Sequence, residues 1–177
     1  MIKNKIYDYA FEKLHNKIYP ICPSERDNII TNNCSKLAWL EPKHFLGNIN
    51  NNNYNIFMDD LRQLFNKLEK EKSPRLKLEI ISEIFKTIIK IKTFNDEESG
   101  TDDILNILIF IFVQIRPKFI DTDIQYIELF QNISNGDIES KFAHLKSACN
   151  IIINIKYNDF IGISKEEFEN KFNNKNN

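Results

Sequence analysis

The sequence has 177 residues, of which 42% are hydrophobic and 28% charged, and its formal net charge is -1 at pH 7. These values are typical of one soluble globular domain and give no reason to expect nucleic acid as a partner. With four Gly and three His, the chain has little material for a Gly-rich phosphate-binding loop or a His-built metal site. The three Cys cannot all pair, and free thiols fit a reducing cytosol. The composition therefore disfavours secreted mini-proteins, Rossmann enzymes, P-loop NTPases and zinc modules.

The chain is unusually rich in two residue types, with 30 Ile and 24 Asn against a single Val. Average proteins are led by Leu, Ala, Gly, Ser and Val, so this pattern indicates a coding bias toward A- and T-rich codons. The Ile excess is therefore not evidence for β-strands, and the spacing of apolar residues has to decide the secondary structure.

The apolar residues recur at helical spacing from the first residues onward. Over residues 2–18 an apolar residue stands at every fourth position, which predicts a helix with one slowly drifting apolar stripe (Ile2, Ile6, Ala10, Leu14 and Ile18). Ser24 with Asp27, and Ser164 with Glu167, read as capping boxes. Ser73 and Pro74 together read as a helix start, and Pro117 as a helix end. The predicted helices are roughly 2–18, 24–37, 41–46, 54–71, 74–92, 101–116, 121–132, 138–155 and 164–172.

The helix predicted over 101–116 is apolar nearly all round after its first turn, which is typical of a helix at the centre of a bundle. Its polar N-terminal end begins with two adjacent carboxylates, Asp102 and Asp103. Acids in a first turn are stabilised by the helix dipole and by unpaired backbone N–H groups, so an ordinary structural role explains them. A carboxylate aimed into the cationic site of a partner is the functional reading, and both readings stay open at this point.

No other group of residues in the sequence indicates a catalytic or metal-binding site. His15, His44 and His144 lie far apart in the sequence, so we expect no metal site and no cofactor. No nucleophile or metalloprotease motif is present, which leaves a hydrolytic enzyme the least supported function. The N-terminus does not resemble a signal peptide, and no stretch is apolar enough to cross a bilayer, so we expect a cytoplasmic protein.

One run of residues resembles a known family. The segment GTDDILNILIFIFVQIRPKFIDTDIQYIELF, residues 100–130, resembles the core signature of the Vps-nine (vacuolar protein sorting nine) domain. Flanking segments resemble the family in the same order, namely KLAWLEPKHF (36–45), SPRLKLEIISEIFKTI (73–88), FAHLKSACNIIINI (142–155) and ISKEEFENKF (163–172). The resemblance implies a Vps-nine-like domain over 21–172, after an N-terminal helix (1–20) that resembles the end of a preceding bundle. Residues 173–177 are expected to form a disordered tail.

The resemblance also implies a fold and a function. The family fold is an all-α layered bundle, here of about eight or nine helices. The family activity is guanine-nucleotide exchange on Rab GTPases of the Rab-five class, in endocytosis and vesicle trafficking at early endosomes. Asp102 would enter the nucleotide site of the GTPase, pair with its phosphate-loop lysine and disfavour Mg²⁺ binding. This mechanism is non-covalent and prefers the nucleotide-free GTPase. Any association with endosomes would arise through partners, without direct membrane insertion.

The chain departs from the family at three contact positions. The family usually has Pro where this chain has Asn106, and Tyr and Thr where it has Ser140 and Ala143. The two substitutions in the later helix remove a large amphipathic contact and a hydroxyl. Nearby side chains that could compensate are Lys141, Phe142 and His144. The predicted GTPase-binding residues are Asp103, Asn106, Ser140, Lys141, Ala143 and His144, beside Asp102 as the residue that drives exchange.

Two alternatives to an exchange factor remain from the sequence. One is a degenerate Vps-nine-like domain that binds a GTPase or scaffolds a complex without exchange activity. The other is an unrelated helical adaptor.

Overall fold

The computed structural model describes residues 2–46, 52–95, 102–131, 133 and 136–173, and for 46, 52–55, 94, 95, 102 and 103 it describes the backbone alone. The part of the chain described in this way is all-α and contains no strand, as predicted. Its helices are α1 (Ile2–Ile18), α2 (Glu25–Lys36), α3 (Lys43–Leu46), α4 (Asn52–Lys70), α5 (Pro74–Asn95), α6 (Asp102–Ile115), α7 (Ile120–Phe130), α8 (Gly136–Ile153), the 3-10 turn η1 (Tyr157–Asp159) and α9 (Lys165–Asn173).

The predicted boundaries agree with these helices to within three residues. The capping box of Ser24 and Asp27 is present at the start of α2, and the Ser164 hydroxyl accepts from the backbone N–H of Glu167 at the start of α9. Arg116 adopts a left-handed conformation (φ 57°) directly before Pro117, and so leaves the right-handed helical region that a following proline disfavours. This turn ends α6 where the sequence predicted.

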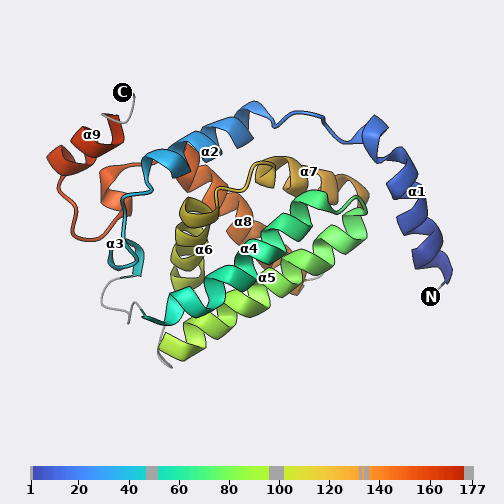
Figure 1. The fold of residues 1–177 in the computed structure, drawn as a ribbon, viewed down its shortest axis with the longest axis horizontal. Helices are drawn as coiled ribbons and strands as arrows, with labels where there is room; N and C mark the ends of the chain where they lie inside the picture. Colours follow the sequence, from blue (N-terminus) through green and yellow to red (C-terminus); the bar gives the residue numbers. More distant parts are fainter. Residues whose placement is uncertain (1, 47–51, 96–101, 132, 134–135, 174–177) are drawn as a thin grey trace.

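The central helix of the bundle is α6. Every side chain from Ile107 to Val113 is buried, and the helix packs against α8, α3, α5, α2 and α4. In Figure 1, α4 and α5 run side by side along one face of the molecule, while α1 and α9 lie at its two ends. The prediction of a buried central helix is confirmed, and the neighbours of α6 hold its first turn at one edge of the bundle.

Helix α1 packs on the bundle through a different face from the one that its apolar stripe suggested. Its half-buried residues are Tyr7, Asp8, Phe11 and His15, and its other described residues are exposed. Tyr7 donates a hydrogen bond to the carbonyl of Phe130 at the end of α7 (2.9 Å), and the Phe11 ring contacts the Phe130 ring at 5.0 Å. The aromatic residues therefore make the contact, and the stripe that predicted the helix faces solvent.

Asp27 joins the starts of two helices. Its fully buried carboxylate accepts from the backbone N–H and the hydroxyl of Ser24. It also accepts from the backbone N–H of Asp121 (2.7 Å) and from the hydroxyl of Thr122 in α7. One carboxylate therefore caps both α2 and α7, and it satisfies backbone donors that would otherwise be buried and unpaired.

Replacing Asp27 by asparagine should lower the free energy of unfolding by about 1–2 kcal/mol, because the amide removes one acceptor oxygen and the charge. Chemical denaturation followed by circular dichroism measures the change. Asp59→Asn is a matched control, since the Asp59 side chain is exposed and pairs with Arg62 at the surface. Equal stability of the Asp27 variant and the native chain would contradict the assigned capping role.

A buried ion pair lies under the connection between α1 and α2. The ammonium of Lys77 in α5 is 2.7 Å from a carboxylate oxygen of Asp123 in α7, and their side chains are 0% and 1% exposed. Lys77 also donates to the carbonyl of Leu68, and the Tyr19 hydroxyl donates to Asp123 at 2.6 Å. Burial raises the pKa of Asp123 to about 6, against the opposing effects of Lys77 and Tyr19.

Candidate functional site

The first turn of α6 carries the two acids that the sequence singled out. Asp102 and Asp103 are the first two residues of α6, and their side chains lie outside the described residues. A helix N-terminus leaves four backbone N–H groups without intrahelical partners and carries a partial positive charge. The roles assigned to the two carboxylates therefore stay predictions, while their place at the start of the central helix is described by the structure.

The residues that follow form the rim of this helix end. Ile104, Leu105 and Asn106 are half-buried, in contrast to the fully buried side chains from Ile107 onward. Asn106 therefore lies on the part of α6 that a partner can reach. The other two residues of the rim give this part of the surface an apolar character.

Helix α8 presents the other predicted contact positions. Ser140 and Ala143 are exposed, three residues apart on one helix face, and exposed Ser147 continues that face one turn further. Phe142 is 2% exposed and belongs to the core, so the suggestion that it compensates for the missing Tyr is wrong. The helical period explains the difference, because Phe142, Leu145 and Cys149 all point inward.

Lys141 and His144 occupy the flank of α8 and are half-buried. The ammonium of Lys141 donates to the carboxylate of Asp137 one turn earlier, at 2.6 Å. The ring of His144 lies edge-on to Phe85 of α5, with its Nδ1 2.8 Å from the carbonyl oxygen of Ser140. Because a carbonyl only accepts, this contact requires a proton on Nδ1. Both side chains are thus partly engaged within the fold.

Helix α5 lies beside this flank, a neighbour that the sequence does not predict. A shallow cleft of about 330 Å³ lies between α5 and the start of α8. Leu78 and Ile138 supply its apolar part, and Ser82, Glu83 and Lys86 lie at its polar side. The apolar period in residues 73–88 predicted α5, but it gave no indication of which exposed residues would meet α8.

The described residues hold no group of three or more His, Cys, Asp or Glu that could bind a metal ion. Burial raises the pKa of the Cys34 thiol to about 12 and raises the pKa of Cys149 as well, which leaves both thiols protonated and unreactive near neutral pH. None of the described helices is both long and apolar enough to cross a membrane. The surface formed by α6 and α8 is the one at which the sequence predicts contact with a partner protein.

Comparison with known families places this surface in context. Residues 58–157 match the Vacuolar sorting protein 9 (VPS9) domain. The chain belongs to the VPS9 domain family. The matched region runs from α4 through α8 and includes every residue predicted to contact a GTPase. No curated protein matches the chain.

Membership of the VPS9 family confirms the resemblance seen in the sequence and excludes an unrelated helical adaptor. The VPS9 family is of the Rab exchange-factor type, and its partners are small GTPases. The family is one of nucleotide exchange factors rather than of catalytic enzymes. The α6 and α8 surface is accordingly the candidate GTPase-binding surface.

Proposed function

We propose that the chain is a guanine-nucleotide exchange factor for a small GTPase of the Rab-five class. The observation that carries the proposal is the VPS9 match over α4 to α8, with Asp102 as the first residue of the central helix. The functional unit is residues 21–172, and α1 is an attached helix. A cytoplasmic location with endosomal association through the GTPase follows from this function.

The proposed mechanism depends on charge. The carboxylate of Asp102 enters the nucleotide site, pairs with the phosphate-loop lysine of the GTPase and disfavours Mg²⁺ in its usual place. GDP then loses its two main countercharges. Each loss of about 1.4 kcal/mol in GDP binding speeds release about tenfold, provided that the transition state for release shares the loss. Charge-assisted hydrogen bonds in a poorly hydrated interface are strong enough to supply several such steps.

An exchange assay tests this proposal. GTPases of the Rab-five class are loaded with fluorescent GDP, and its release is followed with and without micromolar chain. A Rab of another class is the control for specificity. Acceleration for at least one Rab-five-class GTPase, with tighter binding of its nucleotide-free form, is the expected result. No acceleration for any of them would refute exchange activity.

A second candidate function is a VPS9 domain that binds a GTPase or scaffolds a complex without exchange. The exposed face of α8 favours it, because Ser140 and Ala143 offer little contact area where the family has larger residues. This function predicts measurable binding with equal affinity for the GDP-bound and nucleotide-free GTPase, and an unchanged rate of GDP release.

The small residues on α8 suggest a gain-of-function test. The double variant Ser140→Tyr/Ala143→Thr should raise the exchange rate at subsaturating chain concentration by about tenfold, because a tyrosine anchor adds buried contact area to the complex. Both positions are exposed, so the bundle itself should keep its stability.

The matched control for this gain is Asn16→Tyr/Ala10→Thr on exposed positions of α1, which should leave exchange unchanged. An unchanged rate in the α8 variant would show that the GTPase does not use this face. A similar gain in the α1 control would point to a nonspecific effect of the added side chains.

A further inference from the structure

Helix α1 exposes an apolar stripe along its outer side. Ile2 is 75% exposed, Ile6 63%, Leu14 46% and Ile18 38%, and Ala10 between them is also exposed. Exposed apolar residues occurring singly are ordinary, but a continuous stripe along a helix marks an interaction surface. We call this set the outer face of α1.

The inner side of α1 fixes which way the outer face points. The guanidinium of Arg75 in α5 forms an ion pair with Asp8 at 2.5 Å, and the Ser73 hydroxyl donates to Asp8 at 2.6 Å. Together with the Tyr7 and Phe11 contacts to α7, these bonds hold α1 at one end of the molecule (Figure 1). Ile2 and Ile6 are therefore turned away from the bundle, and the outer face drifts round the helix from there toward Ile18, by about 40° for each step of four residues.

The charges on α1 are distributed unevenly. Its four lysines, Lys3, Lys5, Lys13 and Lys17, are exposed, and none forms an ion pair with another described residue. Its two acids lie toward the bundle, since Asp8 is paired with Arg75 and Glu12 lines the cleft beside the α4–α5 turn. Lys5 lines the same cleft, so Lys3, Lys13 and Lys17 are the lysines that add positive charge beside the outer face.

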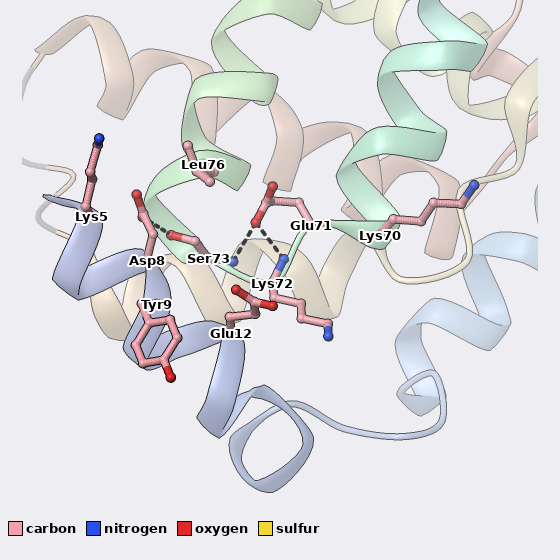
Figure 2. Close-up of a pocket in the computed structure, with 9 residues that line it drawn as sticks. All are labelled: Lys5, Asp8, Tyr9, Glu12, Lys70, Glu71, Lys72, Ser73 and Leu76. Carbon is pink, nitrogen blue, oxygen red and sulfur yellow. Dashed lines mark hydrogen bonds between the residues drawn. The ribbon is translucent and has the colours of Figure 1, made fainter.

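The cleft beside α1 does not itself collect positive charge. Figure 2 shows Asp8 turned toward Ser73, while Lys5 and Tyr9 point away from that contact. The cleft has a volume of about 480 Å³, and three lysines and three acids line it, which balances its charge (Lys5, Lys70, Lys72, Asp8, Glu12 and Glu71). The cleft therefore offers no net positive charge to hold a small anion.

We propose that the outer face of α1 binds the surface of an anionic lipid bilayer, with its apolar stripe at the headgroup boundary and its lysines among the headgroups. An amphipathic helix of this kind lies in the plane of the interface, and anionic lipids attract nearby lysines. A second copy of the chain fits less well, because pairing two outer faces would bring like charges together. This contact is direct, unlike the expected recruitment through partners, and it is independent of exchange activity.

Sedimentation with vesicles tests the proposal on the full chain. Vesicles of phosphatidylcholine with phosphatidylserine should bind the chain, vesicles of phosphatidylcholine alone should not, and binding should weaken as salt is raised. Lys13→Gln/Lys17→Gln should lower the partition coefficient roughly 25-fold, at about fivefold for each lysine. Ile2→Gln/Ile6→Gln should lower it by about tenfold or more.

Matched controls lie on the far half of the α4–α5 pair (Figure 1). Lys86→Gln/Lys90→Gln and Ile56→Gln/Ile89→Gln change exposed residues of the same kinds and should leave vesicle binding within about twofold. Ile6→Trp gives an independent readout, because insertion should shift its emission to the blue with anionic vesicles only.

Three results would overturn the proposal. The first is that the chain, at micromolar concentration, does not bind anionic vesicles. The second is that binding persists in both α1 double variants. The third is that vesicles with phosphatidylserine bind the chain no more strongly than vesicles without it. A concentration-dependent dimer that is lost in Ile2→Gln/Ile6→Gln, without lipid binding, would assign the outer face to a second copy instead.

Discussion

Replacing Asp102 by alanine should slow GDP release from the partner GTPase by about 100-fold at a fixed chain concentration, a loss of about 2.7 kcal/mol. The expected size follows from the proposed mechanism, in which the carboxylate competes for the phosphate-loop lysine and disfavours Mg²⁺. A contact made only when the nucleotide leaves acts on the rate rather than on general affinity. Release of fluorescent GDP under single-turnover conditions measures it.

Two matched variants separate charge from structure. Asp102→Asn keeps the size and the hydrogen-bonding capacity of a helix-start residue but lacks the charge, so it should lose nearly as much activity as alanine. Asp103→Ala removes a first-turn acid from the neighbouring position and should lose less than tenfold. Helicity and unfolding midpoint should stay close to the native values in all three. An alanine variant with near-native exchange, or a larger loss at Asp103, would contradict the assignment.

Most of the secondary structure could be predicted from the sequence. The helical spacing of the apolar residues agrees with the positions of the residues that begin and end helices. Pro74 and Pro117 begin and end helices where predicted, and Ser24 caps α2 with Asp27. The run from Ile107 to Val113 is buried on every side, as expected of a helix with apolar residues all round. These features are local, so neighbouring residues in the sequence are enough to reveal them.

The packing of α1 could not be predicted in the same way. Two stripes run along this helix, one aliphatic through Ile2 and Ile6 and one aromatic through Tyr7 and Phe11. Both have helical spacing, and the contacts that hold the aromatic stripe against the bundle include those of Tyr7 and Phe11 with Phe130 of α7. The choice rests on a contact between residues more than a hundred positions apart, which periodicity does not report.

Which single residues of the candidate site face outward could be predicted from the sequence, but which helices lie beside them could not. The period of α8 already implies that Phe142 points inward when Ser140 and Ala143 point outward. The position of α5 beside His144 depends on how helices that are distant in the sequence pack together. Nothing in the sequence indicates the ring contact between His144 and Phe85. Family membership links these residues to a small GTPase as the partner.

Replacing Lys77 by methionine should lower the free energy of unfolding by about 3–5 kcal/mol at pH 7. Methionine fills much of the same space, but the carboxylate of Asp123 would remain buried with the Tyr19 hydroxyl and without its cation. Nothing in the sequence marks Lys77 as a core residue, because lysine in an amphipathic helix is usually exposed. Denaturant unfolding followed by circular dichroism measures the loss.

The loss in Lys77→Met should depend on pH in a defined direction. Without the ammonium, burial raises the pKa of Asp123 further above its unfolded value, so the folded variant holds a proton that the unfolded chain releases. Stability is then retained below the unfolded pKa and lost as pH rises through the folded pKa. The variant should therefore be closest to the native chain near pH 4 and furthest from it at pH 7 and above.

A double-mutant cycle separates the ion pair from simple loss of packing. Asp123→Asn alone leaves the ammonium of Lys77 buried without a countercharge, whereas Lys77→Met/Asp123→Asn removes both charges and keeps an acceptor for Tyr19. The double variant should therefore lose less stability than the sum of the two single variants, by about 2 kcal/mol or more. Strict additivity, or a loss in Lys77→Met that does not change between pH 4 and pH 7, would mean that the two side chains act by filling space. Coupling together with the pH dependence would instead show that charge pairing in the core holds α5, α7 and the α1–α2 connection together.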